Sequence, residues 1–346
     1  MISRKRTHKL EKLARVYDDE VLPVWSRRFG RMVLRELELP DRCQVLDLAC
    51  ATGYPAVDII RRLGPGSRFI AIDSSSALLD VARHKIEEMG AKGVFFRSEI
   101  PGTRLPFADD VYDLVVSNLG LTEMEEPGGA LADYARVTVP GGEVRCTLPL
   151  EGTFQEFHDI YREVLTKHDK NDTLARLDEH IAVSYPTVAD CEGWLKAAGL
   201  NRGRVEVDRF TMLFRSSREF FFAPVIEFGP LAAWKEIAGS GQEMQDIFWY
   251  IKEAIDAYFE GRAFAATVVA GCLIGHKPLS PEEETTFDTG RPDMDPVALG
   301  PETLDTGIPE ALAEIQAASR RRRDTEEEVE LDAFVEGKAR PDHLDD

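Results

Sequence analysis

The ten residues from Val45 to Tyr54, VLDLACATGY, constrain the fold of this chain more than any other stretch. An apolar run there ends in an acid, Asp47, and leads into a turn of small residues, where a charged ligand can approach the backbone closely. A second apolar run closes on Asp73, twenty-six residues after Asp47. Strand, tight turn, helix, strand and acid are the parts of a nucleoside-binding βαβ unit. The sequence therefore predicts a parallel sheet with a nucleoside site at the end of its first strand.

The rest of the chain continues this alternation, and each predicted element is bounded by glycine, proline or capping residues. Helices are predicted at 7–21, 24–37, 55–64, 76–89, 152–184 and 187–198. Strands are predicted at 44–49, 68–73, 93–98, 112–118, 143–150, 204–214 and 263–275, with a turn at Pro140-Gly141-Gly142 before the fifth. Strands separated by helices favour an α/β fold with a Rossmann-like, doubly wound sheet.

Length and composition divide the chain into one folded unit and a tail. The 346 residues are 43% hydrophobic, which is ample for a buried core. We predict one domain over 1–278, with cap insertions at about 152–185 and 216–260, because fifty residues between two strands exceed ordinary loop lengths. Residues 279–346 are predicted to form an acidic, largely disordered tail with a short helix near 309–323.

Charge narrows the classes of partner. Twenty acidic and seven basic residues lie in 278–346, so about thirteen of the twenty excess negative charges belong to the tail. Such a field disfavours nucleic acid as a substrate. The basic clusters at 4–15 and 320–323 are either solvated helix faces or docking sites for the acidic tail or a protein partner.

The five cysteines are scattered without any CxxC pair, which favours reduced, buried and structural thiols. No segment approaches the roughly 20 apolar residues that span a bilayer, and the basic N-terminus has no apolar stretch of signal-peptide length. We therefore expect a cytoplasmic protein without a membrane span or a metal site.

Four blocks in the same order and spacing resemble the class I S-adenosylmethionine-dependent methyltransferases, within the small-molecule group that includes ubiquinone, menaquinone and sterol methylases. The blocks are VLDLACATG, FIAIDSSSALLDVAR, RLPFADDVYDLVVSNLGL and RVTVPGGEV, and the resemblance covers residues 10–278. It implies a seven-stranded sheet with an antiparallel last strand between the fifth and sixth. It also implies S-adenosylmethionine as cofactor and a small-molecule acceptor.

The resemblance also implies which residues contact the cofactor. Asp73 would accept from the ribose hydroxyls, with Ser74 beside it, and the loop from Asp47 to Gly53 would run beside the methionine portion. Ser98 and Glu99 would read the adenine amino group, whereas Asn118 and Leu119 would hold the ammonium and face the methyl group. Tyr17 would close over the carboxylate or serve only in packing.

Two turn positions depart from the glycine that is usual in this family, because Ala49 and Ala51 occupy them. A methyl group on Ala51 is expected to crowd the ligand or strain the backbone, at a cost of roughly 1 to 3 kcal/mol. Two functions stay open: a methyltransferase acting on a small, apolar or aromatic acceptor, or a catalytically silent scaffold of the same fold. Glu123, His158 and His180 lie in segments expected to border the acceptor pocket, but no catalytic base can be chosen among them.

Overall fold

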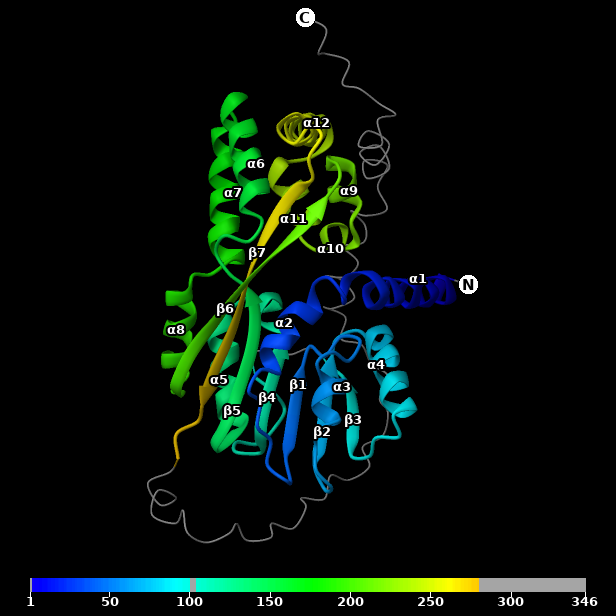
Figure 1. The fold of residues 1–346 in the computed structure, drawn as a ribbon, viewed down its shortest axis with the longest axis vertical. Coiled ribbons are helices and arrows are strands. Elements are labelled where there is room, and N and C mark those ends of the chain that lie inside the picture. The colour runs from blue at the N-terminus through cyan, green and yellow to red at the C-terminus, as the bar shows by residue number, and fades with distance from the viewer. Residues whose placement is uncertain (1, 100–103, 280–346) are drawn as a thin grey trace, which may run out of the picture.

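The computed structural model describes residues 2–99 and 104–279, and it contains a seven-stranded sheet of strand order β3-β2-β1-β4-β5-β7-β6 (Figure 1). The first five strands are parallel, and β7 runs antiparallel between β5 and β6. The strands are β1 Gln44–Leu48, β2 Arg68–Asp73, β3 Val94–Ser98, β4 Tyr112–Asn118, β5 Thr138–Pro149, β6 Asn201–Phe214 and β7 Phe264–His276. The predicted doubly wound sheet with an antiparallel last strand is confirmed.

Helices cover both faces of the sheet. On one face, α2, α3 and α4 bury Val33, Ile59 and Leu79 against β1 and β2. On the other face, α5 and α8 bury Leu131 and Leu195 against the central strands. The helices of this lower part are α1 Ile2–Val16, α2 Ser26–Val33, α3 Ala56–Ile60, α4 Ser76–Glu88, α5 Pro127–Val137 and α8 Val188–Ala197, with a π-helical turn at Tyr17–Val21 and a 3-10 turn at Gly120–Glu123.

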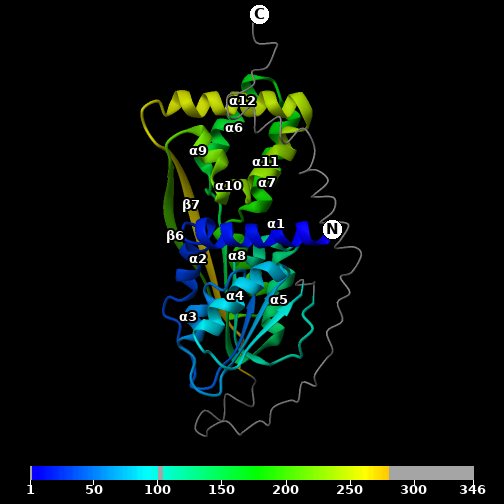
Figure 2. The same ribbon diagram turned by 90° about the vertical axis from the view of Figure 1, so that its right-hand side faces the viewer.

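A helical cap lies beyond the end of the sheet toward which the parallel strands point (Figures 1 and 2). It is built from the two predicted insertions, and the long strands β6 and β7 extend into it. Phe214 and Phe264, at the cap ends of these strands, belong to its aromatic core. The cap helices are α6 Gln155–Lys167, α7 Asn171–Ser184, α9 Ser217–Phe222, α10 Pro224–Glu227, α11 Leu231–Ala238 and α12 Gly241–Tyr258.

The structure corrects several predicted boundaries. Helix α2 covers only part of the predicted 24–37, α3 ends at Ile60, and the predicted helical stretch 152–184 is two helices with a break at 168–170. The N-terminal helix begins at Ile2 rather than at residue 7. The predicted tail and its helix near 309–323 lie outside the described residues.

The expected turn at Pro140-Gly141-Gly142 is instead a bulge inside β5. Tyr112 of β4 pairs with Thr138, but Leu114, only two residues on, pairs with Glu143. A Cβ on Gly142 would lie 2.7 Å from Thr138 Cγ2 and 2.9 Å from the carbonyl oxygen of Asp113, so only glycine fits there. The turn residues were recognised, but the sheet extends through them.

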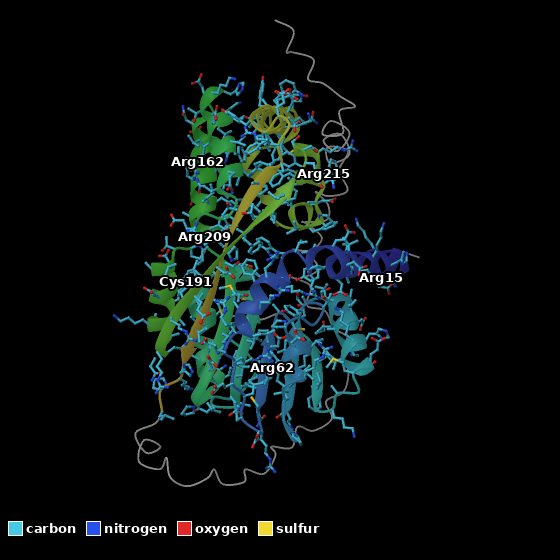
Figure 3. The ribbon with its side chains drawn as sticks, viewed as in Figure 1. Arg15, Arg62, Arg162, Cys191, Arg209 and Arg215 are labelled. Carbon is cyan, nitrogen blue, oxygen red and sulfur yellow. The ribbon has the colours of Figure 1, made fainter. Side chains whose placement is uncertain are left out.

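All five cysteines are free and buried, as predicted from their spacing; one of them, Cys191, lies in α8 (Figure 3). Among residues 2–99 and 104–279, no helix combines the length and the apolar character needed to cross a membrane. In the same ranges, no three His, Cys, Asp or Glu side chains are grouped as metal ligands.

Candidate cofactor site

The turn after β1 holds two alanines in the left-handed backbone region. The φ angles are 58° at Ala49, 46° at Ala51 and 93° at Gly53. This region costs an L-residue roughly 1 to 2 kcal/mol, and glycine does not pay that penalty. Both alanines are partly exposed. The backbone strain expected at Ala51 is therefore present, at the turn where a ligand would lie.

The end of β4 accommodates the extra methyl group of Ala49. A Cβ on Gly120 would lie 2.7 Å from Ala49 Cβ and 2.4 Å from Ser117 Oγ. Leu119, just before it, also has a left-handed backbone, with φ 70°. The alanine after β1 is thus matched by a glycine after β4.

Asp73 fixes this turn to the end of β2. Its Oδ2 accepts the N–H of Ala51 and its Oδ1 accepts the N–H of Ser75, both at 2.8 Å. Burial raises the pKa of Asp73, and these two hydrogen bonds partly oppose the rise. Ser74, between Asp73 and the helix cap, is exposed. Each carboxylate oxygen retains further lone-pair capacity for a ligand hydroxyl.

Asp47 is a buried carboxyl group without a hydrogen-bond partner in the part of the chain that the structure describes. Its pKa is raised well above the usual range, first by burial and then by the charge of Asp73. The hydroxyl of Thr52 is also buried and unpartnered there. A buried acid without a cationic partner favours binding of positive charge nearby, because a cation stabilises the ionised form.

Asn118 and Leu119 tie β4 to its neighbours. The Asn118 side chain donates to the carbonyl of Ser26 at 3.1 Å and accepts from Thr147 Oγ1 at 2.7 Å. The Leu119 N–H donates to the carbonyl oxygen of Thr147 at 3.1 Å. The side chain of Asn118 is thus engaged within the protein.

The N-terminal segment approaches the same edge of the sheet. Tyr17 shares a hydrogen bond of 2.7 Å with Ser26 Oγ. Its pKa is raised to about 12, chiefly by burial and further by the charges of Asp73 and Glu123. Tyr17 is therefore near the acids that follow β2 and β4.

Lys85 of α4 also belongs to this edge, although its sequence context gave no signal. Its ammonium group donates to the carbonyl of Thr52 at 3.0 Å and pairs with the carboxylate of Asp18. This lysine therefore joins the N-terminal segment to the turn after β1.

Ser98 and Glu99 lie beside Asp73, because Ser98 is the register partner of Asp73 in the pairing of β2 with β3. The Glu99 N–H donates to the carbonyl of Asp73 at 3.2 Å, and the Glu99 side chain lies 3.6 Å from the guanidinium of Arg97. The structure thus brings together every residue predicted to contact the cofactor along the ends of β1 to β4 and the adjoining N-terminal turn. Their individual roles stay predictions.

The three candidate bases lie in different surroundings. Glu123 keeps solvent access, yet lost hydration and the charge of Asp73 raise its pKa, so it belongs to the acidic edge. His158 is buried inside the cap. His180 is partly exposed on α7 and lies 3.4 Å from Ser184 Oγ.

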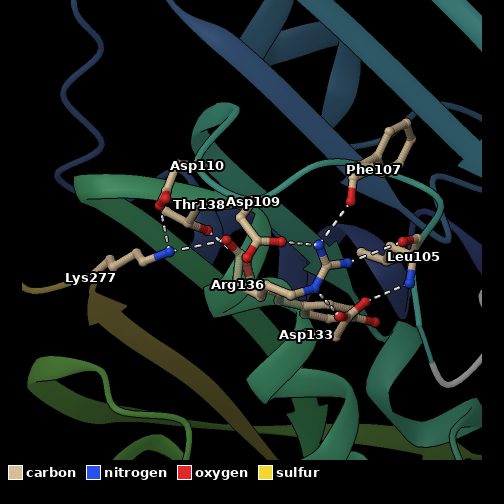
Figure 4. A network of polar contacts seen from close by, with 9 residues as sticks. Leu105, Phe107, Asp109, Asp110, Asp133, Arg136, Thr138 and Lys277 are labelled. Atoms are coloured by element: carbon tan, nitrogen blue, oxygen red, sulfur yellow. Dashed lines mark hydrogen bonds and ion pairs between the residues drawn. The ribbon is translucent and has the colours of Figure 1, made fainter.

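The block RLPFADDVYDLVVSN has a structural role at the opposite end of β4 (Figure 4). The Arg136 guanidinium donates to Asp109 at 2.7 Å, to Asp133 at 2.6 Å and to the carbonyls of Leu105 and Phe107. Lys277 then joins the network through Asp110 at 2.6 Å. These contacts fasten residues 105–110, before β4, to α5, so the first part of the block stabilises the sheet, whereas Asn118 at its end belongs to the cofactor edge.

The acidic edge fits a cationic nucleoside. Asp47, which has no hydrogen-bond partner among the described residues, the turn that follows it and Asp73 at the end of β2 all lie there. Residues 45–142 match the methyltransferase domain family. A demethylmenaquinone methyltransferase of Mycolicibacterium vanbaalenii is 32% identical over 199 residues, which are 54% of this chain and 82% of the relative. The chain belongs to the class I S-adenosylmethionine-dependent methyltransferases, in the ubiquinone/menaquinone methyltransferase group.

Two further proteins are similar to this chain at lower sequence identity. A demethylmenaquinone methyltransferase of Halalkalibacterium halodurans is 28% identical over 161 residues, 45% of this chain. The chain spans 65% of the length of that relative. The solved YcgJ protein of Bacillus subtilis superposes with a TM-score of 0.49 at 14% identity, over 73% of this chain and all of that one.

Proposed function

We propose that the protein transfers the methyl group of S-adenosylmethionine to a small, apolar or aromatic acceptor, with a quinone-like ring as the substrate class. The class is suggested by the relatives, whose names state that they methylate demethylmenaquinone. The aromatic cap beside the cofactor edge supports it, because such walls suit a planar apolar molecule.

The observation that carries the proposal is the acidic edge. Asp47, Asp73 and Glu123 all have raised pKa values, and the charge of Asp73 contributes to the shifts of the other two. The cofactor brings a sulfonium and an ammonium, whereas among the described residues no cationic side chain forms an ion pair with any of these three acids. Binding of the cofactor would therefore relieve an electrostatic cost that the free protein carries.

Each predicted contact has a place in this proposal. Asp73 would hold the ribose diol through its remaining lone pairs, and the turn from Asp47 to Gly53 would run beside the methionine portion. Glu99 and Ser98 would face the adenine, and the backbone oxygens at Asn118 and Leu119 would accept from the ammonium. Tyr17 would cover the carboxylate.

When bound, S-adenosylmethionine supplies a methyl group that is already activated by the sulfonium, so the protein must chiefly align the acceptor and exclude water. Tyr17, Trp25 and Leu119 serve this purpose, since all three pack against the aromatic core of the cap. A base is needed only for an acceptor that enters protonated. Glu123 is then the candidate at the acidic edge, because its raised pKa makes its carboxylate a stronger base than an exposed one.

Titration calorimetry with S-adenosylmethionine tests the proposal. The wild-type protein should bind saturably, and Asp47→Asn, which keeps the shape and removes the charge, should weaken binding about tenfold. Asp80→Asn is the matched control, because Asp80 is an exposed carboxylate of α4 paired with Arg83. Binding heat absent from the wild-type protein would favour the alternative, a silent methyltransferase-fold scaffold that acts through protein contacts.

We further propose that the protein works in the cytoplasm and that its acidic segment 279–346 contacts a protein partner, since twenty of its residues carry negative charge. Nucleic acid is not expected as a partner.

A further inference from the structure

The core of the cap is a cluster of stacked and edge-on rings. Phe157 and Trp234 lie with ring centroids 4.1 Å apart and an interplanar angle of 29°. Phe220 and Phe154 pack on the same indole at 6.1 and 5.6 Å. This core would normally contain only apolar groups, or polar groups that bond to one another.

Three nitrogens in this core lack hydrogen-bond partners among the described residues. They are Nδ1 and Nε2 of His158 and Nε1 of Trp234, whose residues are 1% and 0% exposed. The two rings face each other edge-on with centroids 5.8 Å apart. Leaving such groups unpaired costs stability, so a pair of them in one core calls for a function.

The imidazole of His158 is neutral. Burial lowers its pKa to about 3, and the positive charge of Arg162 adds to the effect, as does His180. A neutral imidazole has one donor and one acceptor nitrogen, and the indole N–H adds a second donor. This set complements an uncharged hydroxyl or carbonyl group.

Stacked aromatic rings connect this cluster to the cofactor edge. Trp25 precedes Ser26, whose carbonyl accepts from Asn118, and its ring stacks on Phe154 at 5.8 Å with an interplanar angle of 4°. Phe154 in turn contacts Trp234 and Tyr185, and Tyr185 lies 5.5 Å from the His158 ring. Leu119, at the end of β4, packs against the same core.

We propose that His158 and Trp234 form the polar end of the acceptor site and bind a hydroxyl or carbonyl oxygen of a planar aromatic acceptor. The proposal rests on the methyltransferase function proposed above. The acceptor ring takes its place among the cap aromatics, and its reacting atom faces the end of β4. Trp25 and Phe154 belong to the stack of rings that joins the cofactor edge to His158, so their rings turn aside when the acceptor enters. His158 is thus a positioning residue.

Two probes of nearly the same shape test this assignment: 1-naphthol, which carries one hydroxyl, and naphthalene, which carries none. Their affinities for the full chain are measured by fluorescence titration in saturating S-adenosylhomocysteine. We expect the wild-type protein to bind 1-naphthol about tenfold more tightly than naphthalene. His158→Phe keeps an aromatic ring and should abolish this preference, while naphthalene binding changes less than about twofold.

Two further variants keep the test decisive. Trp234→Phe removes only the indole N–H and part of the ring, and should reduce the preference about threefold even if His158→Phe fails to fold. His168→Phe changes another cap histidine, which stacks on Tyr250, and should leave the preference intact. Equal binding of the two probes by the wild-type protein, or a preference that survives both His158→Phe and Trp234→Phe, overturns the assignment.

Calorimetry with S-adenosylhomocysteine alone separates this inference from the proposed function. If the protein binds the nucleoside but its preference for 1-naphthol does not depend on His158, the proposed function stands and this acceptor site is refuted. If the preference depends on His158 but the protein does not bind the nucleoside, an aromatic-ligand site stands and the proposed methyltransferase function is refuted.

Discussion

Within residues 2–99 and 104–279, the carboxyl edge of the sheet and the core of the cap both contain polar groups without hydrogen-bond partners, but of opposite kinds. At the edge, Asp47 is a buried acid whose pKa is raised by burial and by Asp73. In the cap, His158 is a buried base whose pKa burial lowers to about 3. The edge therefore favours a cation, and the cap favours a neutral molecule with one polar group. This division corresponds to the two reactants of the proposed methyl transfer, a sulfonium donor and an uncharged ring as acceptor.

The largest effect should come from removing the central ring of the cap. Trp234→Ala is expected to lower the free energy of unfolding by about 3 to 5 kcal/mol, because a fully buried indole leaves a cavity. Affinity for S-adenosylhomocysteine should stay within about threefold, since the edge residues are untouched. Denaturant unfolding and calorimetry measure the two quantities. Trp249→Ala is the control, because Trp249 is only partly buried and should cost much less. A large loss of affinity in Trp234→Ala would mean that the two regions are not independent.

Asp73→Ala should produce the reverse pattern. It removes the acceptor of two backbone N–H groups in the turn and the predicted ribose ligand, so affinity for S-adenosylmethionine should fall about 100-fold. The free energy of unfolding should fall by about 2 kcal/mol, because two backbone N–H groups lose their acceptor. Asp80→Ala on α4 should change neither quantity appreciably. Unchanged calorimetric affinity in Asp73→Ala would remove this acid from the site.

The dependence of stability on pH distinguishes the neutral base from the acids. The folded pKa of His158 lies below the value of about 6.5 for an exposed imidazole, so the unfolded chain takes up the proton first as the pH falls. The contribution of neutral His158 to the free energy of unfolding is complete above pH about 6.5. It should decrease by roughly 2 kcal/mol by pH 5. His158→Phe should flatten the curve of unfolding free energy in this window. His180 has a lowered pKa as well, so part of the slope should remain. An identical slope in both proteins would show that His158 does not stay neutral.

The smallest effect concerns the strained turn. Ala51→Gly relieves the left-handed backbone at φ 46° and removes a methyl group that faces the predicted ligand, so affinity for S-adenosylmethionine should rise by up to about tenfold. Stability should change by less than about 1 kcal/mol, because the greater freedom of glycine in the unfolded chain offsets the relief. Ala135→Gly, inside α5, should instead cost about 1 kcal/mol without changing affinity. Weaker binding by Ala51→Gly would show that the alanine is tolerated without strain.

Local patterns predicted most of the sheet. The bounds of β2 and β4 match the predicted 68–73 and 112–118, because apolar runs between turn residues depend on nearby sequence. The helix predicted at 187–198 begins where expected, with Thr187 as its N-cap and Asp190 completing a capping box, for the same reason. Long-range pairing overrode such signals at Gly142, where neighbouring strands drew the turn residues into β5.

The predicted site was also brought together, since acids after parallel strands must lie along one edge of the sheet. The hydrogen-bond and ion-pair partners of the site residues could not be predicted in this way. Lys85 reaches Thr52 and Asp18, and Asn118 reaches Ser26, across separations that no local pattern encodes.

The sequence by itself determined the architecture, the turn and the acids that end β1 and β2, because these depend on residue type and on spacing along the chain. The tertiary structure decided which polar groups lack partners. Asp47 ends a strand in the sequence, and His158 follows an aromatic residue on a helix; only their surroundings in space make one an uncompensated acid and the other a neutral base. Burial depends on residues far apart in the chain, and burial sets the pKa values on which the proposed chemistry rests.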